Sequence, residues 1–133
     1  MDPRQTKPTR ITQQRRAIER AFERARRPLS PAEIHRLSSK EAPNLSLSTV
    51  YRTLKRMQDD GAISPVSVPD EPPRYELAHV AERHHHHFHC RTCGRVFDLA
   101  GCPTGLGRLV PRGFVLEEHT LVLHGVCREC ARP

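Results

Sequence analysis

Two Cys-x-x-Cys pairs and a run of histidines constrain this chain more than any other feature of its sequence. The first pair, Cys90 and Cys93, comes directly after five histidines at positions 84–87 and 89, and the second pair is Cys127 and Cys130. Thiolates and imidazoles at this density are metal ligands in proteins. The pattern therefore predicts a metal-binding module in the C-terminal part of the chain.

The two cysteine pairs predict a structural zinc site. Four thiolates complete the tetrahedral shell of Zn²⁺ and leave no open position, and such an ion staples a small module with little apolar core. Two disulfides or free thiols are the alternatives. The first residues lack the apolar stretch of a secretion signal and no run is long enough to span a membrane, so we expect a cytoplasmic protein whose paired cysteines bind zinc.

The histidine run predicts a second kind of metal site. The run is internal, which is not where a purification tag would stand, and a polar surface strand is the other alternative. Side chains alternate along a strand, so His85 and His87 would point to one face and His84 and His86 to the other. Each pair can then chelate a metal. Glu76 and His79 lie just upstream and can complete the first pair.

Ligands for the pair on the opposite face are expected further downstream. The available side chains are Asp98, Glu117, Glu118 and His119. Such mixed nitrogen and oxygen donors bind Zn²⁺, Fe²⁺ or Mn²⁺, and the residues alone do not choose among these metals. The remaining cysteine, Cys102, is interpreted as a small structural residue, with a soft metal ligand or a redox-sensitive thiol as the alternatives.

Formal charge is concentrated in the N-terminal part of the chain. Residues 1–60 hold 14 Lys and Arg against 7 Asp and Glu, whereas residues 61–133 hold 8 of each, so the whole net charge of +7 lies in the first part. Such asymmetry is expected where one half of a protein faces a polyanion. A solvated basic surface is the alternative.

The basic part predicts a helix-turn-helix followed by a hairpin. Apolar residues recur at helical spacing in three segments, and strands are expected at residues 62–68 and 74–77. The first helix is expected to be capped by Thr12 and to end at Pro28, and the second to start at Ser30-Pro31. The third helix is expected from Thr49 to about Asp60, with Ser46 or Ser48 as its cap. In a winged helix of this kind the last helix enters the major groove of DNA.

The exposed face of the third helix supports DNA binding, because its residues are basic and aromatic: Tyr51, Arg52, Lys55 and Arg56. We therefore expect an α+β protein. Residues 1–77 would form a winged-helix DNA-binding domain, residues 78–83 a hinge, and residues 84–133 a small α/β metal-binding domain. The last is expected to hold strands at 95–99 and 120–126, joined by a Gly- and Pro-rich segment with only a short helix at 106–110.

Taken together, these motifs resemble the ferric uptake regulator family. The resemblance rests on Leu47-Ser48-Thr49-Val50-Tyr51-Arg52-Thr53-Leu54, on Tyr75-Glu76-Leu77, on the stretch from His84 to Gly94, and on Cys127-Arg128-Glu129-Cys130. It spans residues 9–130. It implies a homodimeric, metal-activated repressor that binds a palindromic operator in double-stranded DNA and dimerises through its C-terminal domain.

The resemblance also implies roles for individual residues. The structural zinc ligands would be Cys90, Cys93, Cys127 and Cys130. The regulatory ligands would be Glu76, His85 and His87, and a second site would use His84, His86, Asp98 and His119. Tyr51 and Arg52 would contact bases or phosphates of the DNA, helped by Arg10 or Arg15. We also expect Ser48, Thr49 and Lys55 among the DNA-binding residues.

Two departures from the family pattern refine these expectations. Many members place a regulatory histidine just before the second helix, whereas residues 26–29 here read Arg-Arg-Pro-Leu. His79 on the hinge can replace it, which favours a zinc sensor over an iron or peroxide sensor. The second departure follows Leu99, where members usually have a longer helix and this chain has Gly101-Cys102-Pro103-Thr104-Gly105.

Two other classes of protein fit parts of the pattern. A zinc-dependent hydrolase or deaminase needs an open metal site and a general base, such as His-x-Glu before a cysteine pair, and no His-x-Glu occurs in the sequence. A zinc-binding interaction module without a DNA role would not need the basic third helix. A metal-responsive repressor therefore remains the leading hypothesis, and we expect no catalytic residues.

Overall fold

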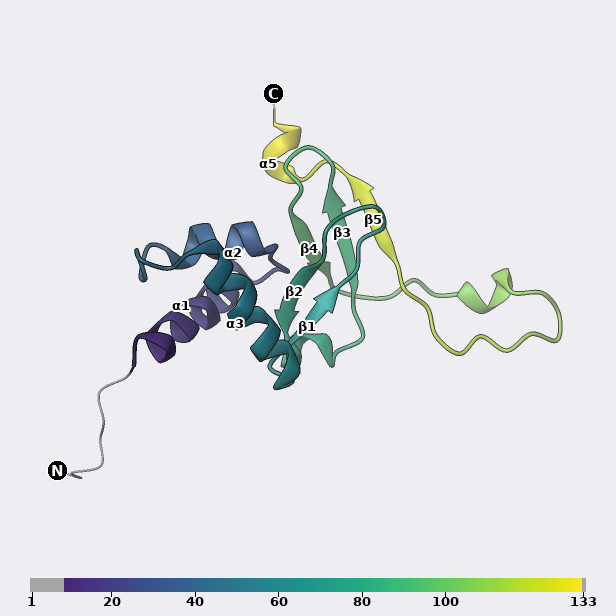
Figure 1. The fold of residues 1–133 in the computed structure, drawn as a ribbon. Helices are drawn as coiled ribbons and strands as arrows, with labels where there is room; N and C mark the ends of the chain where they lie inside the picture. The colour runs from purple at the N-terminus through teal and green to yellow at the C-terminus, as the bar shows by residue number, and fades with distance from the viewer. Residues whose placement is uncertain (1–8, 133) are drawn as a thin grey trace.

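The computed structural model describes residues 9–132 and shows an α+β protein made of two modules (Figure 1). The N-terminal module contains α1 (Arg10–Ala25), α2 (Pro31–Ser38), α3 (Leu47–Asp59), β1 (Ile63–Val66) and β2 (Arg74–Leu77). The C-terminal module contains β3 (His86–Cys90), β4 (Val96–Leu99), the 3-10 turn η1 (Leu106–Leu109), β5 (Val122–Gly125) and α5 (Arg128–Ala131). A short helix, α4 (Ala78–Ala81), lies between the modules, where the sequence predicts a hinge.

Side-chain caps set the starts of the three long helices. Ser30 and Glu33 form a capping box around Pro31 at the start of α2, and the Ser46 hydroxyl accepts a hydrogen bond at the start of α3, as the sequence predicts. The expectation for α1 is wrong at both ends. Its cap is Thr9, whose hydroxyl accepts from the backbone of Thr12, and the helix ends at Ala25 because Arg26 adopts a left-handed conformation with φ of 53°.

The core of the N-terminal module lies among these helices and the first strand. Its fully buried members recur at helical spacing, which is why the periodicity in the sequence predicts the buried faces correctly. On the helices they are Ile18, Ala21 and Phe22 of α1, Ile34 of α2, and Val50, Leu54 and Met57 of α3. Leu29, Leu45 and Ile63 complete the core from outside the helices. This packing leaves the opposite face of α3 in solvent.

The wing is an antiparallel hairpin of β1 and β2 in which Ile63 is opposite Leu77. A bridge between Leu29 and Tyr75 attaches the hairpin to the segment that joins α1 and α2. Helix-turn-helix and wing together form a winged helix, in agreement with the sequence prediction. No helix of the described residues is long and apolar enough to cross a membrane.

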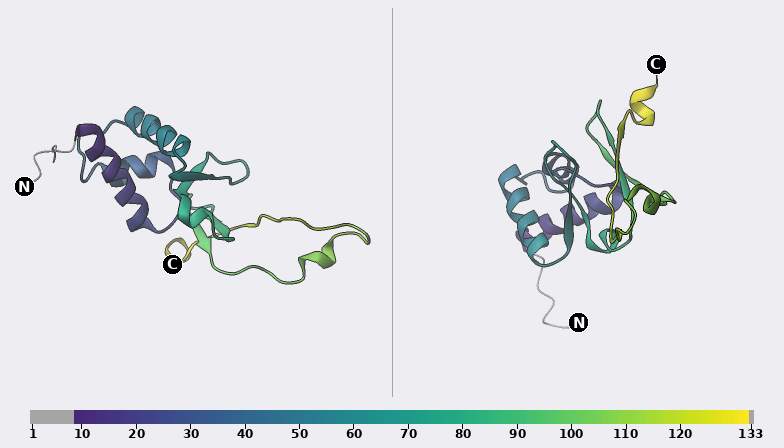
Figure 2. Two further views of the ribbon diagram at one scale, coloured as in Figure 1. Left: turned by 90° about the horizontal axis from the view of Figure 1, so that it is seen from below. Right: turned by 90° about the vertical axis from the view of Figure 1, so that its right-hand side faces the viewer.

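The C-terminal module is a three-stranded sheet in the order β4-β3-β5. β3 is antiparallel to β4 and parallel to β5, so β4 ends and β5 begins at the same end of the sheet, beside His86 and His87 at the start of β3. The connection between β4 and β5, residues 100–121, is called the arm below. It extends away from both modules and contains only η1, in place of a longer helix (Figure 2).

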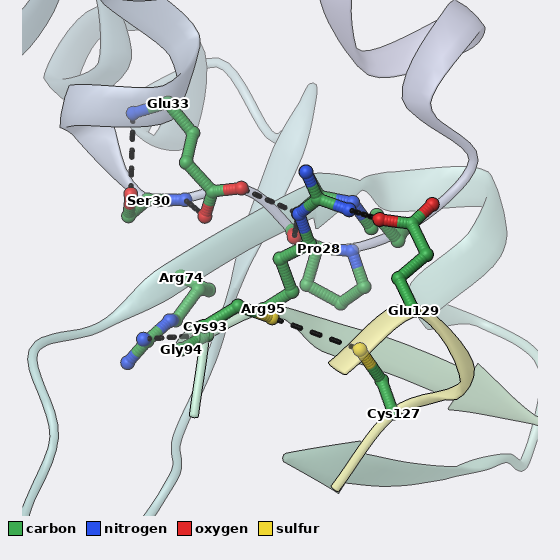
Figure 3. Close-up of polar contacts among 10 residues, drawn as sticks. Pro28, Ser30, Glu33, Arg74, Cys93, Gly94, Arg95, Cys127 and Glu129 are labelled. Carbon is green, nitrogen blue, oxygen red and sulfur yellow. Dashed lines mark hydrogen bonds and ion pairs between the residues drawn. The ribbon is translucent and has the colours of Figure 1, made fainter. Parts of the chain in front are cut away.

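The two modules contact each other along the wing. Val66 and Val68 of the wing pack against Val96 on β4, and Val122 covers the same small apolar cluster. Arg74 is 6% exposed and donates a hydrogen bond of 2.7 Å to the carbonyl of Gly94 (Figure 3). The C-terminal sheet is therefore in direct contact with the winged-helix module.

Candidate metal centres and DNA-binding face

The four paired cysteines meet where the sheet joins the C-terminal helix. Cys90 ends β3, Cys93 follows in a turn closed by Gly94, and Cys127 caps α5, which carries Cys130. The four cysteine sulfurs all lie within 4.8 Å of one another. Figure 3 shows Cys93 and Cys127, whose sulfurs are 3.8 Å apart. An S–S bond is about 2.05 Å long, whereas two ligands of one tetrahedral Zn²⁺ with Zn–S bonds of about 2.3 Å are about 3.8 Å apart.

The surroundings of these sulfurs shift the pKa values of two of the thiols in opposite directions. Backbone N–H groups of Cys93 and Cys127 point at the buried Cys90 sulfur and lower the pKa of its thiol to about 6. The neighbouring Cys127 sulfur, together with burial, raises the pKa of the Cys130 thiol to about 12. Four crowded sulfurs cannot all carry negative charge without a cation among them, so the donor set fits a divalent ion.

A second cluster joins the wing to the sheet. It consists of Glu76 on β2, His85 just before β3, His87 on β3 and Asp98 on β4, each with one ligand atom within 4.8 Å of the others. Nε2 of His85 is 3.2 Å from Glu76 Oε2 and 3.5 Å from Asp98 Oδ1. Nε2 of His87 is 3.7 Å from the same Glu76 oxygen and 3.4 Å from the same Asp98 oxygen.

Two observations show that this second cluster suits a metal ion. Nε2 of His87 is buried and has no hydrogen-bond partner, although two carboxylates lie nearby. Nδ1 of His85 is hydrogen-bonded to the carbonyl of Arg83, which turns Nε2 of that ring toward the cluster in the way that backbone carbonyls orient metal-binding histidines. Burial lowers the pKa of His87, but the carboxylates of Asp98 and Glu76 outweigh burial and raise it to about 9.

Asp98 corrects the sequence prediction, which placed it with His84 and His86. Asp98 lies directly opposite His87 in the antiparallel ladder of β3 and β4, and residues paired in this way point to the same face of a sheet. His79 does not join the cluster. It is exposed on α4 and lines an adjoining cavity of about 410 Å³ together with Glu76 and Asp98.

A third cluster occupies the other face of β3. It contains His84, His86 and His119, as the sequence predicts, and its fourth member is Cys102 rather than Asp98. His86 is 2% exposed, and burial lowers its pKa, which favours the neutral ring. Glu117 and Glu118, also considered for this face, are exposed on the arm outside the cluster. The soft thiol of Cys102 indicated a metal ligand. Cys102 lies in a loop whose sequence has no periodicity, so the sequence could not predict which residues lie beside it.

The exposed face of α3 carries the predicted DNA-binding side chains. Tyr51 is 56% exposed, and Ser48, Arg52 and Lys55 are exposed beside it. The hydroxyl of Thr49 accepts a hydrogen bond of 3.2 Å from Arg52, which holds the guanidinium along the helix. Arg10 and Arg52 line the same polar groove of about 340 Å³ between α1 and α3.

Arg15, the remaining predicted contact, is engaged within the protein. Its guanidinium lies 3.0 Å from Asp60 and 3.4 Å from Glu19. The pair with Asp60 fastens α1 to the end of α3, whereas the pair with Glu19 lies within α1. The geometry therefore gives Arg15 a role in holding the helix that presents the other side chains.

A basic winged helix joined to a sheet with three His- and Cys-rich clusters defines a metal-responsive, DNA-binding transcription regulator. The chain matches the ferric uptake regulator family over residues 6–124, and it belongs to that family. Members of this family bind DNA as dimers, and they are transcription regulators rather than enzymes. The zinc-dependent hydrolase considered above is therefore ruled out.

Relatives in the family differ in what they sense. A ferric uptake regulation protein of Synechococcus elongatus is 33% identical over 129 residues, which cover 92% of this chain and 86% of that protein. The peroxide-responsive repressor PerR of Staphylococcus aureus is 29% identical over 91% of this chain and 82% of its own length. The structure of a zinc-bound manganese uptake regulator is 35% identical, covers 90% of this chain and 91% of that one, and superposes with a TM-score of 0.74.

Proposed function

We propose that this protein is a zinc-responsive repressor that binds a palindromic operator as a homodimer, in the cytoplasm, and controls metal-homeostasis genes. The observation that carries the proposal is the second cluster. Glu76 belongs to the wing, whereas His85, His87 and Asp98 belong to the sheet module. A divalent ion held there supplies positive charge between the two carboxylates and links both modules through shared ligands. The wing and α3 are then held in one orientation relative to the dimerising sheet.

Orientation matters because a dimer must insert two recognition helices into successive major grooves, about 34–36 Å apart. For metal to activate DNA binding, the arrangement with correctly spaced recognition helices needs only to bind the metal more tightly than the other arrangements do. We further propose that Arg10, Ser48, Thr49, Tyr51, Arg52 and Lys55 contact the DNA, and that Arg15 positions α3. The exposure of the α3 face and the basic N-terminal part support this assignment.

Zinc is proposed from the donor set and its spacing. The contacts in the second cluster measure 3.2–3.7 Å. Four-coordinate Zn²⁺ with bonds of about 2.0–2.1 Å needs ligand atoms about 3.3–3.4 Å apart, which these distances bracket. Zn²⁺ also suits the four thiolates of Cys90, Cys93, Cys127 and Cys130, which we propose as the structural site. The related manganese uptake regulator was solved with zinc bound.

The alternatives within the family are Fe²⁺ or Mn²⁺ sensing and peroxide sensing, because relatives of each kind match the chain. Operator sequences can be selected from a random double-stranded DNA library with the protein at saturating Zn²⁺. Binding to the selected sequence is then measured against buffered Zn²⁺, Fe²⁺ and Mn²⁺, and after peroxide treatment. The proposal expects Zn²⁺ to activate at the lowest free concentration and peroxide to have no effect on the zinc form. Activation by Fe²⁺ or Mn²⁺ alone would contradict it.

A further inference from the structure

A cavity between the two modules is lined by more positive charge than its own carboxylate can neutralise. The cavity has a volume of about 290 Å³ and lies between α1, α2 and the turn that precedes β4. Its charged lining consists of five cations and one carboxylate: Arg24, Arg27, Arg36, Lys40, Arg95 and Glu41. We propose that this cavity, called the basic cavity below, binds a small phosphate monoester.

Three cations of the basic cavity have carboxylate partners within the protein. Glu41, the carboxylate of the lining, lies 2.8 Å from Arg24 and 2.5 Å from a second arginine of α1. Its one charge is therefore shared between two guanidinium groups. The other two partners come from outside the lining, in the pairs of Arg27 with Glu33 and of Arg95 with Glu129.

The remaining two cations, Arg36 and Lys40, form no ion pair with any residue in the described part of the chain. Arg36 is on the last turn of α2, and Lys40 follows the end of that helix. Both side chains line the same cavity as Arg95, so like charges from two modules face one space. A bound anion relieves the repulsion among them.

The lining also indicates which class of anion fits. A guanidinium group presents N–H donors in a planar fork that matches two phosphate oxygens, and an ammonium group adds a point charge. The rest of the lining is apolar and made mostly of small side chains: Ala17, Ala21, Ala25 and Leu37. A ligand that carries an apolar body on its phosphate group uses both parts, whereas inorganic phosphate uses the cations alone.

The basic cavity is separate from the sites described above. None of its residues belongs to the three metal clusters, and none lines the groove between α1 and α3 that holds predicted DNA contacts. Arg95 comes from the sheet module and the other four cations from the winged-helix module, so a bound ligand connects the two. The inference goes beyond the proposed function. Its test uses neither DNA nor added zinc, so either can fail without the other.

Calorimetric titration with two phosphate probes tests the site. The full chain retains its structural zinc, and the buffer contains no phosphate and no free Zn²⁺, so that a probe cannot bind through an added metal ion. Inorganic phosphate reports the cations alone, whereas phenyl phosphate also reports the apolar part of the lining. Phenyl phosphate should bind about tenfold more tightly than inorganic phosphate, because its ring is removed from water. Phenol, which lacks the charge, should not bind.

Matched variants show which residues hold the ligand. Arg36→Ala/Lys40→Ala should weaken phenyl phosphate binding at least about tenfold, because it removes hydrogen bonds to a charged group. Arg108→Ala/Arg112→Ala removes two charges from exposed positions on the arm and should bind like the parent protein. Arg95→Ala should also weaken binding, because the sheet module supplies one side of the site.

Each arm of the experiment has a result that would overturn the inference. Equal affinities of the two double variants would show that the probes respond to net charge and not to this cavity. Equal affinities of the parent for the two probes, or no binding of either, would rule out a monoester site. Unchanged affinity of Arg95→Ala would refute the connection between modules. Arg36 and Lys40 are exposed, so their replacement should not disturb folding, and the thermal transition checks this.

Discussion

His87 on β3 lies directly opposite Asp98 on β4, and its Nε2 is 3.4 Å from the Asp98 carboxylate and 3.7 Å from that of Glu76 on the wing. One partly buried imidazole thus lies beside two carboxylates from different modules. Strand pairing fixes the first contact, and packing of the wing on the sheet fixes the second. The position of the wing relative to the sheet is therefore coupled to whatever occupies the space between these three side chains.

Asp98→Asn should weaken zinc binding at the second cluster. Mutating partners that merely orient a ligand lowers metal affinity about 10–100-fold, so loss of a carboxylate that binds directly should cost at least as much. The affinity is measured by competition with a fluorescent zinc chelator after the structural site is filled. Asp70→Asn is the matched control, because Asp70 is exposed in the turn of the wing. Equal affinities of the two variants would show that Asp98 is not a ligand.

Zinc affinity of the same cluster should rise with pH up to about 9. The neighbouring carboxylates raise the pKa of His87 from 6.5 to about 9 despite its burial, so the metal-free ring holds a proton below that pH. A ligating imidazole must release this proton, and affinity should therefore fall by up to about tenfold for each pH unit below 9. Calorimetry in buffers of different ionisation enthalpy should find proton release at pH 7. Affinity that is constant between pH 7 and 9 would contradict the assignment.

Cys93→Ser should unfold the C-terminal module. Its sulfur is 3.8 Å from that of Cys127, and a structural zinc held at such a site contributes about 10–16 kcal/mol of apparent binding energy in small zinc-dependent peptides, which is lost together with the fold. Thermal unfolding and the dimer mass report the effect. Cys102→Ser is the control for removing a thiol outside this site. A Cys93→Ser protein that keeps both the dimer and the thermal transition would refute the structural role.

Arg52→Ala should weaken operator binding without changing metal content. Arg52 is exposed on α3 and held by Thr49, and one good contact to a base is worth about 1–3 kcal/mol. Affinity is compared at fixed salt and saturating Zn²⁺ with that of Arg36→Ala, which removes the same charge from an exposed position on α2. If the two variants bind the operator equally well, Arg52 does not read DNA.

Local patterns predicted much of this structure, and long-range pairing accounts for most of what they missed. The alternation of strand side chains correctly separated His85 and His87 from His84 and His86. The face occupied by Asp98 depends on the register between β3 and β4, which no local pattern encodes. Cys102 lies in a loop without periodicity, so only the folded arm shows its neighbours. The cap of α1 was missed because Thr9 and Thr12 are both acceptable capping residues, three positions apart.

The most direct test of the regulatory site is the operator affinity of His85→Ala across a zinc titration. His124→Ala is the control, because His124 is exposed on β5 and belongs to none of the three clusters. The account predicts that His85→Ala retains the structural zinc, the fold and the dimer but no longer gains operator affinity as Zn²⁺ is added, whereas His124→Ala responds like the parent protein. If His85→Ala responds to Zn²⁺ as the parent does, the second cluster is not the regulatory switch.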